Sequence, residues 1–155
     1  MPEQPASPAA APVPPVVLPA GTLLGFDFGE KRIGVATGET LLRQAHPLTV
    51  IPGEQVEARF NAIAKLIAEW RPVGLVVGRP VHMDGTPHAL TARCERFANQ
   101  LHGRFRLPVA LAEERLTSAD AESRLFEAGH TSRSARQHLD AVAAQLILQG
   151  YFDAL

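Results

Sequence analysis

Three acidic residues, Asp27, Glu114 and Asp140, lie where predicted strands or a helix could direct their carboxylates to one point. Carboxylate oxygens are the ligands that Mg²⁺ and Mn²⁺ prefer in proteins. Two such ions, bridged by carboxylates, can activate a water molecule and stabilise the leaving oxygen of a phosphodiester. The three acids therefore predict a metal-dependent nuclease. The alternative is that each acid is a solvated residue at the end of an element.

The spacing of the three acids suggests how they could meet. Asp27 is late in the first predicted strand, and Glu114 comes just after the last one. If these strands are neighbours in the sheet, the two carboxylates meet in the crevice at the strand ends. Asp140 follows Leu139 at the border of a helical apolar stripe, so packing of that stripe would turn Asp140 toward the sheet. Such carboxylates repel one another unless a cation lies between them.

A turn next to Asp27 carries two glycines and two cations. Its sequence, from Gly29 to Gly34, includes Lys31 and Arg32. Glycine allows close approach to the backbone, and the cations could hold a phosphate of a substrate. A plain hairpin turn is the alternative interpretation.

Composition restricts the partner and the compartment. The chain has 155 residues and a formal net charge of −1, and 46% of its residues are hydrophobic. No apolar segment reaches the roughly 18 residues of a membrane span, so no membrane partner is expected. The single Cys94 excludes an intrachain disulfide and favours a reducing cytoplasm, with Cys94 as a packing residue. Because the charges nearly balance, any nucleic acid must bind local basic clusters, such as Lys31/Arg32, Arg93/Arg96 and Arg104/Arg106.

The chain divides into a tail and one α/β domain. Seven of the 13 prolines lie in residues 1–19, so residues 1–20 are expected to be a disordered Pro/Ala-rich tail outside the fold. Residues 21–155 alternate between strand and helix patterns and predict a mixed five-stranded sheet flanked by helices, in the order β-β-β-α-β-α-β-α-α. The predicted strands are 23–28, 33–37, 45–51, 73–77 and 108–112. The predicted helices are 54–70, 87–101, 117–126 and 134–152.

Four motifs, in this order along the chain, resemble the YqgF family. They are Phe-Asp-Phe-Gly-Glu-Lys-Arg-Ile-Gly-Val-Ala at 26–36, Val-Gly-Arg-Pro at 77–80 with Met-Asp-Gly-Thr at 83–86, Glu-Arg-Leu-Thr-Ser at 114–118, and Leu-Asp-Ala-Val-Ala-Ala at 139–144. This family comprises pre-16S rRNA nucleases and proteins similar to Holliday-junction resolvases. The similarity covers residues 21–153, which is everything but the tail.

The resemblance implies a ribonuclease H-like fold, a cytoplasmic location and a role in maturing the 5′ end of 16S rRNA. It also implies that Asp27, Glu114 and Asp140 are the metal-binding catalytic set, with Mg²⁺ or Mn²⁺ as cofactor. Substrate contacts are expected at Gly29, Lys31, Arg32, Arg79, Asp84, Arg115 and Thr117.

Two departures from the family pattern bear on these residues. Glu113-Glu114-Arg115 replaces the usual Asp-Glu-Arg, so Glu113 could share or take the role of Glu114. Gly78-Arg79-Pro80 replaces Gly-Leu-Pro, which adds a cation at the expected substrate face. Neither departure removes a carboxylate.

Several functions remain open at this point. An actin-like ATPase opens with a similar strand and hairpin, but it needs two such domains, and 155 residues supply one. A DNA endonuclease similar to Holliday-junction resolvases fits the same residues. So does a non-catalytic factor that binds structured nucleic acid, pre-16S rRNA or branched DNA, together with the ribosome-assembly or transcription machinery. The oligomeric state is open as well.

Overall fold

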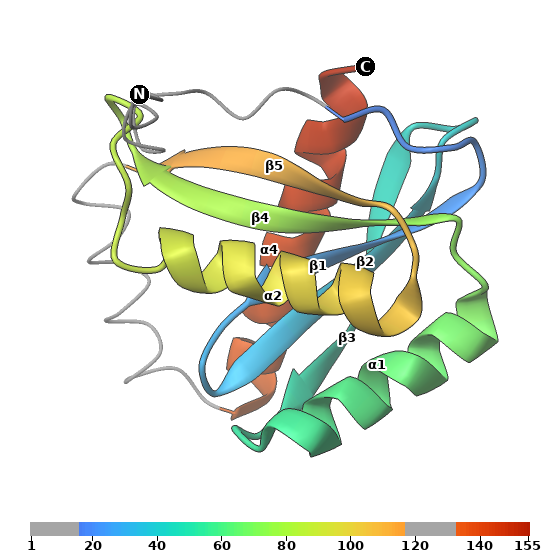
Figure 1. Cartoon of the computed structure of the whole chain (residues 1–155), viewed down its shortest axis with the longest axis horizontal. Coiled ribbons are helices and arrows are strands. Elements are labelled where there is room, and N and C mark those ends of the chain that lie inside the picture. Colours follow the sequence, from blue (N-terminus) through green and yellow to red (C-terminus); the bar gives the residue numbers. More distant parts are fainter. Residues whose placement is uncertain (1–15, 117–132) are drawn as a thin grey trace, which may run out of the picture.

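A five-stranded mixed sheet lies at the centre of the molecule in the computed structural model, which describes residues 16–116 and 133–155. The strand order is β3-β2-β1-β4-β5 (Figure 1). The first three strands form an antiparallel meander, and β4 and β5 run parallel to β1. The strands are β1 (Thr22–Phe28), β2 (Arg32–Glu39), β3 (Gln44–Pro52), β4 (Gly74–His82) and β5 (Val109–Leu116).

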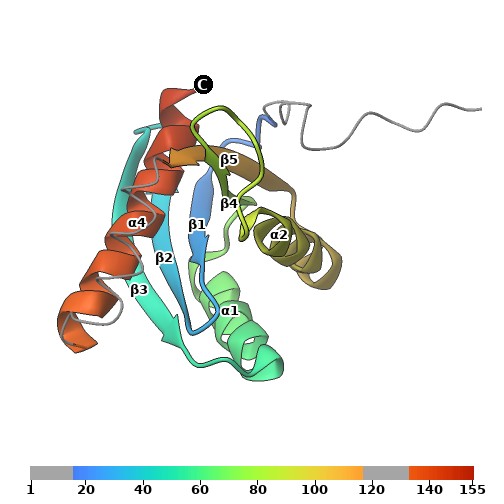
Figure 2. The same ribbon diagram turned by 90° about the vertical axis from the view of Figure 1, so that its left-hand side faces the viewer.

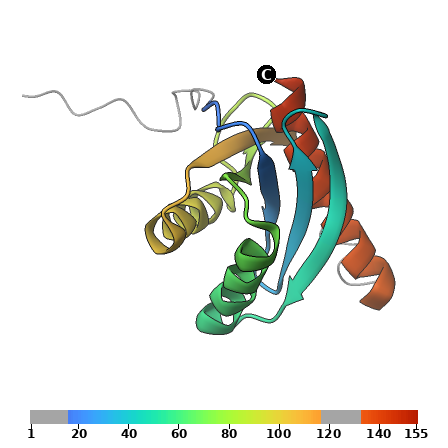
Figure 3. The same ribbon diagram turned by 90° about the vertical axis from the view of Figure 1, so that its right-hand side faces the viewer.

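Helices cover both faces of this sheet. Helix α4 (Arg133–Asp153) crosses one face, and α1 (Val56–Trp70) and α2 (Thr91–Phe105) cover the other (Figures 2 and 3). The predicted α/β fold with a mixed five-stranded sheet flanked by helices is confirmed. The expected helix at 117–126 lies outside the described residues.

The alternation of side chains along each strand creates two cores. On β1, Leu24 and Phe26 pack against α1 and α2, whereas Leu23 packs against α4. The α4 side of the sheet consists largely of small residues, among them Ala36 and Ala110, so the helix can lie close to the strands. Asp27 continues the α4 side of β1, because residues two apart on a strand face the same way.

Strand β4 is longer than its sequence suggests. Residues 73–77 were expected to form the strand and Gly78-Arg79-Pro80 a loop, but β4 continues to His82. The continued pairing with β5, through Arg79 with Glu113 and Pro80 with Glu114, maintains the strand despite the glycine and the proline. Glu114 is accordingly inside β5 rather than past its end.

The expected boundary between tail and domain is wrong by several residues. Leu18 is buried between β4 and α4, and its backbone N–H donates to the Tyr151 hydroxyl at 2.6 Å. Residues 16–20 therefore belong to the fold, because an apolar side chain following the prolines fills a gap beside Gly74. None of the helices in the described ranges is long and apolar enough to cross a membrane.

Candidate active site

Asp27 and Asp140 come from different elements and lie at the same place on the sheet. Asp27 on β1 pairs with Gly34 on β2, so the Asp27 side chain and the position that a Gly34 side chain would take are both on the α4 face. A Cβ atom at Gly34 would lie 1.9 Å from the backbone oxygen of Asp140. The helix backbone thus contacts β2 directly beside Asp27, and only a glycine permits this approach.

Glu114 reaches the same face from β5. A Cβ atom at Gly78 of β4 would lie 2.8 Å from Glu114 Oε1, so the carboxylate lies over this glycine. Gly78 follows Val77, whose partner on β1 is Phe26, the residue before Asp27. The Glu114 carboxylate therefore lies over β4, the strand between β5, which carries Glu114, and β1, which carries Asp27. The three expected acids share one face of the sheet.

Asp140 forms an ion pair with Arg32. Arg32 Nε donates to Asp140 Oδ2 at 2.6 Å, and both side chains are about one quarter exposed. Within residues 16–116 and 133–155, no group of three or more His, Cys, Asp or Glu side chains is arranged to hold a metal ion. The structure brings the acids to one face without closing them around one point.

The negative field of the acids extends to Cys94 on α2. Burial raises the pKa of the Cys94 thiol to about 12, and the charges of Asp27, Glu114 and Glu95 contribute to this rise. The thiol is 2% exposed and holds its proton at neutral pH. Cys94 is a packing residue, as expected from the sequence.

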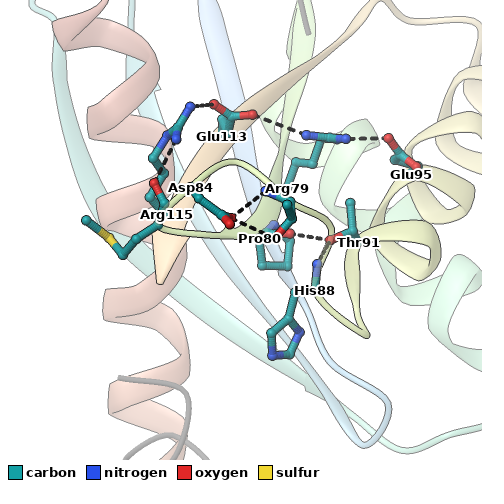
Figure 4. Close-up of polar contacts among 10 residues, drawn as sticks. Arg79, Pro80, Asp84, His88, Thr91, Glu95, Glu113 and Arg115 are labelled. Atoms are coloured by element: carbon teal, nitrogen blue, oxygen red, sulfur yellow. Dashed lines mark hydrogen bonds and ion pairs between the residues drawn. The ribbon is translucent and has the colours of Figure 1, made fainter. Parts of the chain in front are cut away.

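Glu113 points away from Glu114, to the α2 side of the sheet. Its Oε1 accepts a hydrogen bond from Arg79 Nη1 at 3.2 Å (Figure 4). Glu113 therefore does not share the position of Glu114. Arg79, which was expected to contact substrate, is 3% exposed and also donates to Glu95 Oε2 at 2.8 Å, and its substrate contact stays a prediction. The Arg79 side chain faces inward from β4, so its guanidinium is buried beneath the surface.

The other residues expected to bind substrate differ in accessibility. Lys31 is exposed and Gly29 is half-buried in the β1–β2 turn. Asp84 is exposed and accepts from the backbone N–H of Thr86 at 2.9 Å, and Arg115 donates to the backbone oxygen of Met83 at 2.8 Å. Thr117 lies outside the described residues.

Comparison with known proteins identifies the family. The model described as "RuvX: Holliday junction resolvase" matches residues 21–154. The chain belongs to the RuvX family. The resemblance deduced from the four motifs is confirmed, and the family match begins at the residue before β1.

Several relatives of this RuvX-family chain carry the name "Putative pre-16S rRNA nuclease". The protein of Dechloromonas aromatica (strain RCB) is 63% identical over 134 residues, which are 86% of this chain and 92% of the relative. That of Nitrosomonas europaea is 58% identical over 134 residues, 86% of this chain and 90% of the relative. Among solved structures, T. thermophilus RuvC in complex with a Holliday junction substrate aligns with 86% of this chain and 94% of its own, at 16% identity and a TM-score of 0.48.

The donor chemistry of this RuvX-family site fits a divalent cation. All three acids supply carboxylate oxygens, which are suited to Mg²⁺ or Mn²⁺. Gly34 and Gly78 have no side chains, which lets the Asp140 backbone and the Glu114 carboxylate lie directly against the strands.

Sequence reasoning missed Arg59 on α1, which organises the turn beside Asp27. Arg59 is 8% exposed and donates to the backbone oxygens of Gly29 and Glu30, the latter at 3.1 Å. Its guanidinium carbon lies 5.1 Å from the centre of the Phe28 ring. The sequence did hold one signal of this contact: Arg59 is a cation next to Phe60, on the apolar side of a predicted helix.

Proposed function

We propose that this protein is a metal-dependent nuclease that hydrolyses phosphodiester bonds in structured nucleic acid and processes the 5′ end of pre-16S rRNA. The observation that carries the proposal is the placement of Asp27, Glu114 and Asp140 on one face of the sheet, with glycines at the points of closest approach. The names of the relatives support rRNA as the substrate.

Asp27, Glu114 and Asp140 would hold Mg²⁺ or Mn²⁺, which supplies a water molecule activated for attack and charge stabilisation at the leaving oxygen. The residues of the β1–β2 turn hold the nucleic acid. Arg32 binds a phosphate next to the scissile bond, and Lys31, which is exposed, binds a neighbouring one.

Arg32 connects substrate binding to the acids. In the structure its guanidinium neutralises Asp140, at 2.6 Å. A phosphate at the turn competes with Asp140 for the same guanidinium. Once Arg32 pairs with the phosphate, the Asp140 carboxylate is available to the cation. Asp140 would then complete the set of carboxylates only when nucleic acid is bound.

Two other functions have an observation in their favour. The family description names a Holliday junction resolvase, which favours branched DNA as substrate. The ion pair of Asp140 with Arg32 favours a non-catalytic factor that binds nucleic acid, since the pair leaves no three-acid group around one point in the described part of the chain.

We also place the activity in the cytoplasm, in contact with the ribosome-assembly or transcription machinery. Precursor rRNA is made and folded there, and the names of the relatives refer to it.

The test uses purified full-length protein with a precursor 16S rRNA fragment and with a four-way DNA junction, each in Mg²⁺, in Mn²⁺ and in EDTA. The proposal predicts cation-dependent cleavage of the rRNA precursor near the mature 5′ end. Cleavage of the junction alone would favour the resolvase. Binding of either substrate without cleavage would favour the non-catalytic factor.

A further inference from the structure

A chain of charged groups connects β5 with its surroundings on the face opposite Glu114. Arg79 Nε donates to Glu95 Oε2 at 2.8 Å, and Arg79 Nη1 donates to Glu113 Oε1 at 3.2 Å. Arg115 Nη2 donates to Glu113 Oε2 at 3.4 Å (Figure 4). Glu113 is the member of this chain that accepts from two arginines, one on each carboxylate oxygen.

The chain of charges joins three parts of the structure. Through Arg79 and Glu95 it connects β5 with helix α2. Through Arg115, which also donates to the backbone oxygen of Met83 at 2.8 Å, it connects β5 with the loop at 83–86. This loop is closed by its own hydrogen bonds, from the His82 N–H to the Thr86 oxygen at 2.8 Å and from the Gly85 N–H to the His82 oxygen at 2.9 Å.

Glu113 lies directly before Glu114 in the same strand. The two side chains leave β5 on opposite faces, so contacts that fix Glu113 and Arg115 also fix the backbone from which the Glu114 side chain projects. The carboxylate of Glu114 has to lie over Gly78 of the neighbouring strand, and this position depends on the register and orientation of that short stretch of β5.

The ion pairs with Glu113 are poor candidates for a role in stability alone. The Glu113 side chain is 29% exposed and that of Arg115 is 47% exposed. Exposed pairs of this kind contribute little to the free energy of unfolding. For a buried arginine such as Arg79, the free energy lost by removing the charge from water offsets much of what its ion pairs contribute. What these contacts supply is a defined geometry.

We propose that Glu113 is a positioning residue that holds the 83–86 loop, α2 and the end of β5 in one arrangement and thereby sets the place of the Glu114 carboxylate. The inference rests on the proposed function, because it takes Glu114 as a cation ligand. It assigns Glu113 a role distinct from that of a ligand, on the opposite face of the sheet.

The test is Glu113→Gln in the full-length protein. Glutamine keeps the size of the side chain but offers one acceptor oxygen, so only one arginine can retain its bond. The matched control is Glu57→Gln, which removes the charge from a different Glu–Arg pair, Glu57 with Arg104 at 2.8 Å. That pair joins α1 and α2 and does not contact β5 or the loop.

Three measurements distinguish positioning from a merely structural role. Amide exchange at residues 82–86 should become about tenfold faster in Glu113→Gln, because opening of the loop loses a charge-assisted contact. Mn²⁺ affinity should fall several-fold. The kcat for the rRNA precursor should fall about ten- to a hundredfold with KM nearly unchanged, since a small misplacement of a reacting group has effects of this size. The control should match the wild-type protein in loop exchange and Mn²⁺ affinity.

Failure of the positioning role and failure of the proposed function give different results. Suppose that the wild-type protein binds Mn²⁺ and cleaves the precursor. If Glu113→Gln then has the same loop exchange, Mn²⁺ affinity and kcat, the positioning role is wrong and the proposed function stands. Faster loop exchange with unchanged Mn²⁺ affinity and kcat would also overturn the positioning role. A wild-type protein that neither binds Mn²⁺ nor cleaves would instead contradict the proposed function, and the role of Glu113 toward Glu114 would fall with it.

Discussion

In the proposed function, Arg32 takes part in both the binding of nucleic acid and the chemistry. Its ion pair with Asp140 is short, at 2.6 Å, but both side chains are about one quarter exposed. Partly exposed pairs contribute about 0–1 kcal/mol, so a substrate phosphate can displace Asp140 from the guanidinium at little cost. We therefore expect the ion pair to keep Asp140 neutralised until nucleic acid binds.

Replacement of both turn cations should weaken binding of nucleic acid. In Lys31→Ala/Arg32→Ala we expect lower affinity and a salt dependence of log Kd that is shallower by about 1–2, because each lost phosphate contact removes one counterion-release contribution. Filter binding or anisotropy at several salt concentrations measures both. Lys65→Ala, an exposed lysine on α1, is the control. Equal slopes for all three proteins would place the phosphate path elsewhere.

Cys94 provides a pH-dependent check of the packing beneath the acids. Its pKa is raised from 9.0 to about 12 by burial and by nearby carboxylates, so the folded protein holds the thiol proton more tightly than the unfolded chain does. The free energy of unfolding that this pKa difference contributes is fully present below pH 9 and is lost as the pH rises toward 12. We expect the native thiol to resist a disulfide reagent at pH 8, and the unfolding free energy to fall more steeply above pH 9 than in Cys94→Ala. Rapid modification of the native protein at pH 8 would contradict the burial.

Some of the residue-scale detail follows from sequence, and some does not. Strand alternation alone predicts that Glu113 and Glu114 face opposite sides. The burial of Arg79 could not be deduced in this way, because it depends on Glu95 from α2 and Glu113 from β5, neither of which is near it in sequence. An arginine in a Gly-Arg-Pro segment is more typical of an exposed loop.

At the scale of elements, the approach of α4 to the sheet decides whether the acids can meet. The helix contacts β2 at Gly34 with backbone against backbone, and Asp140 is carried on that turn of the helix. Small residues on the α4 side of the strands, rather than large interlocking side chains, set this distance.

Gly34→Ala should separate the helix from the strand. Its methyl group would lie 1.9 Å from the Asp140 oxygen, so we expect a loss of about 3 kcal/mol in unfolding free energy. Gly103→Ala is the control, because no atom beyond its own stretch of helix lies within 4 Å of its Cβ position and alanine favours a helix by about 0.5–1 kcal/mol. Denaturant unfolding measures both. A Gly34→Ala protein as stable as wild type would mean that α4 does not contact β2 in this way.

The order of the elements was predictable, and their ends were less so. Apolar periodicity gave the three-strand meander and the alternation that follows it. The continuation of β4 through Pro80 was missed because Gly and Pro usually end a strand, whereas here pairing with β5 outweighs that preference. Helix α2 begins at Thr91 rather than at 87, since Pro87 forms a bridge to Val81.

At the scale of the whole molecule, the two ends of the described fold meet. Leu18 packs in the core beneath α4, and its N–H bonds to Tyr151 near the end of that helix. The N-terminal segment therefore contributes to holding α4, and with it Asp140, against the sheet. The proline-rich composition concealed this contact, because a single leucine carries it.

Two truncations test the contribution of this segment. Deletion of residues 1–20 removes Leu18 and should lower the unfolding free energy by about 2 kcal/mol, or the Tm by about 5–8 °C. Deletion of residues 1–15 should change it little, because that part of the sequence has no pattern suited to packing. Thermal unfolding of both, with Leu18→Ala in the full chain as control, gives the comparison. Identical melting temperatures for the two truncations would show that Leu18 contributes nothing.

The central claim, that the three acids form a nuclease site, is tested most directly by Asp27→Asn in a single-turnover cleavage assay on the rRNA precursor with saturating Mg²⁺. Asp153→Asn, the same change at an exposed position near the end of α4, is the matched control. We expect Asp27→Asn to abolish cleavage and to bind the precursor as tightly as wild type or more tightly, because a negative charge beside the phosphate path is removed. Asp153→Asn should cleave at the wild-type rate. Wild-type cleavage by Asp27→Asn, in a preparation shown to be free of contaminating nuclease, would contradict it.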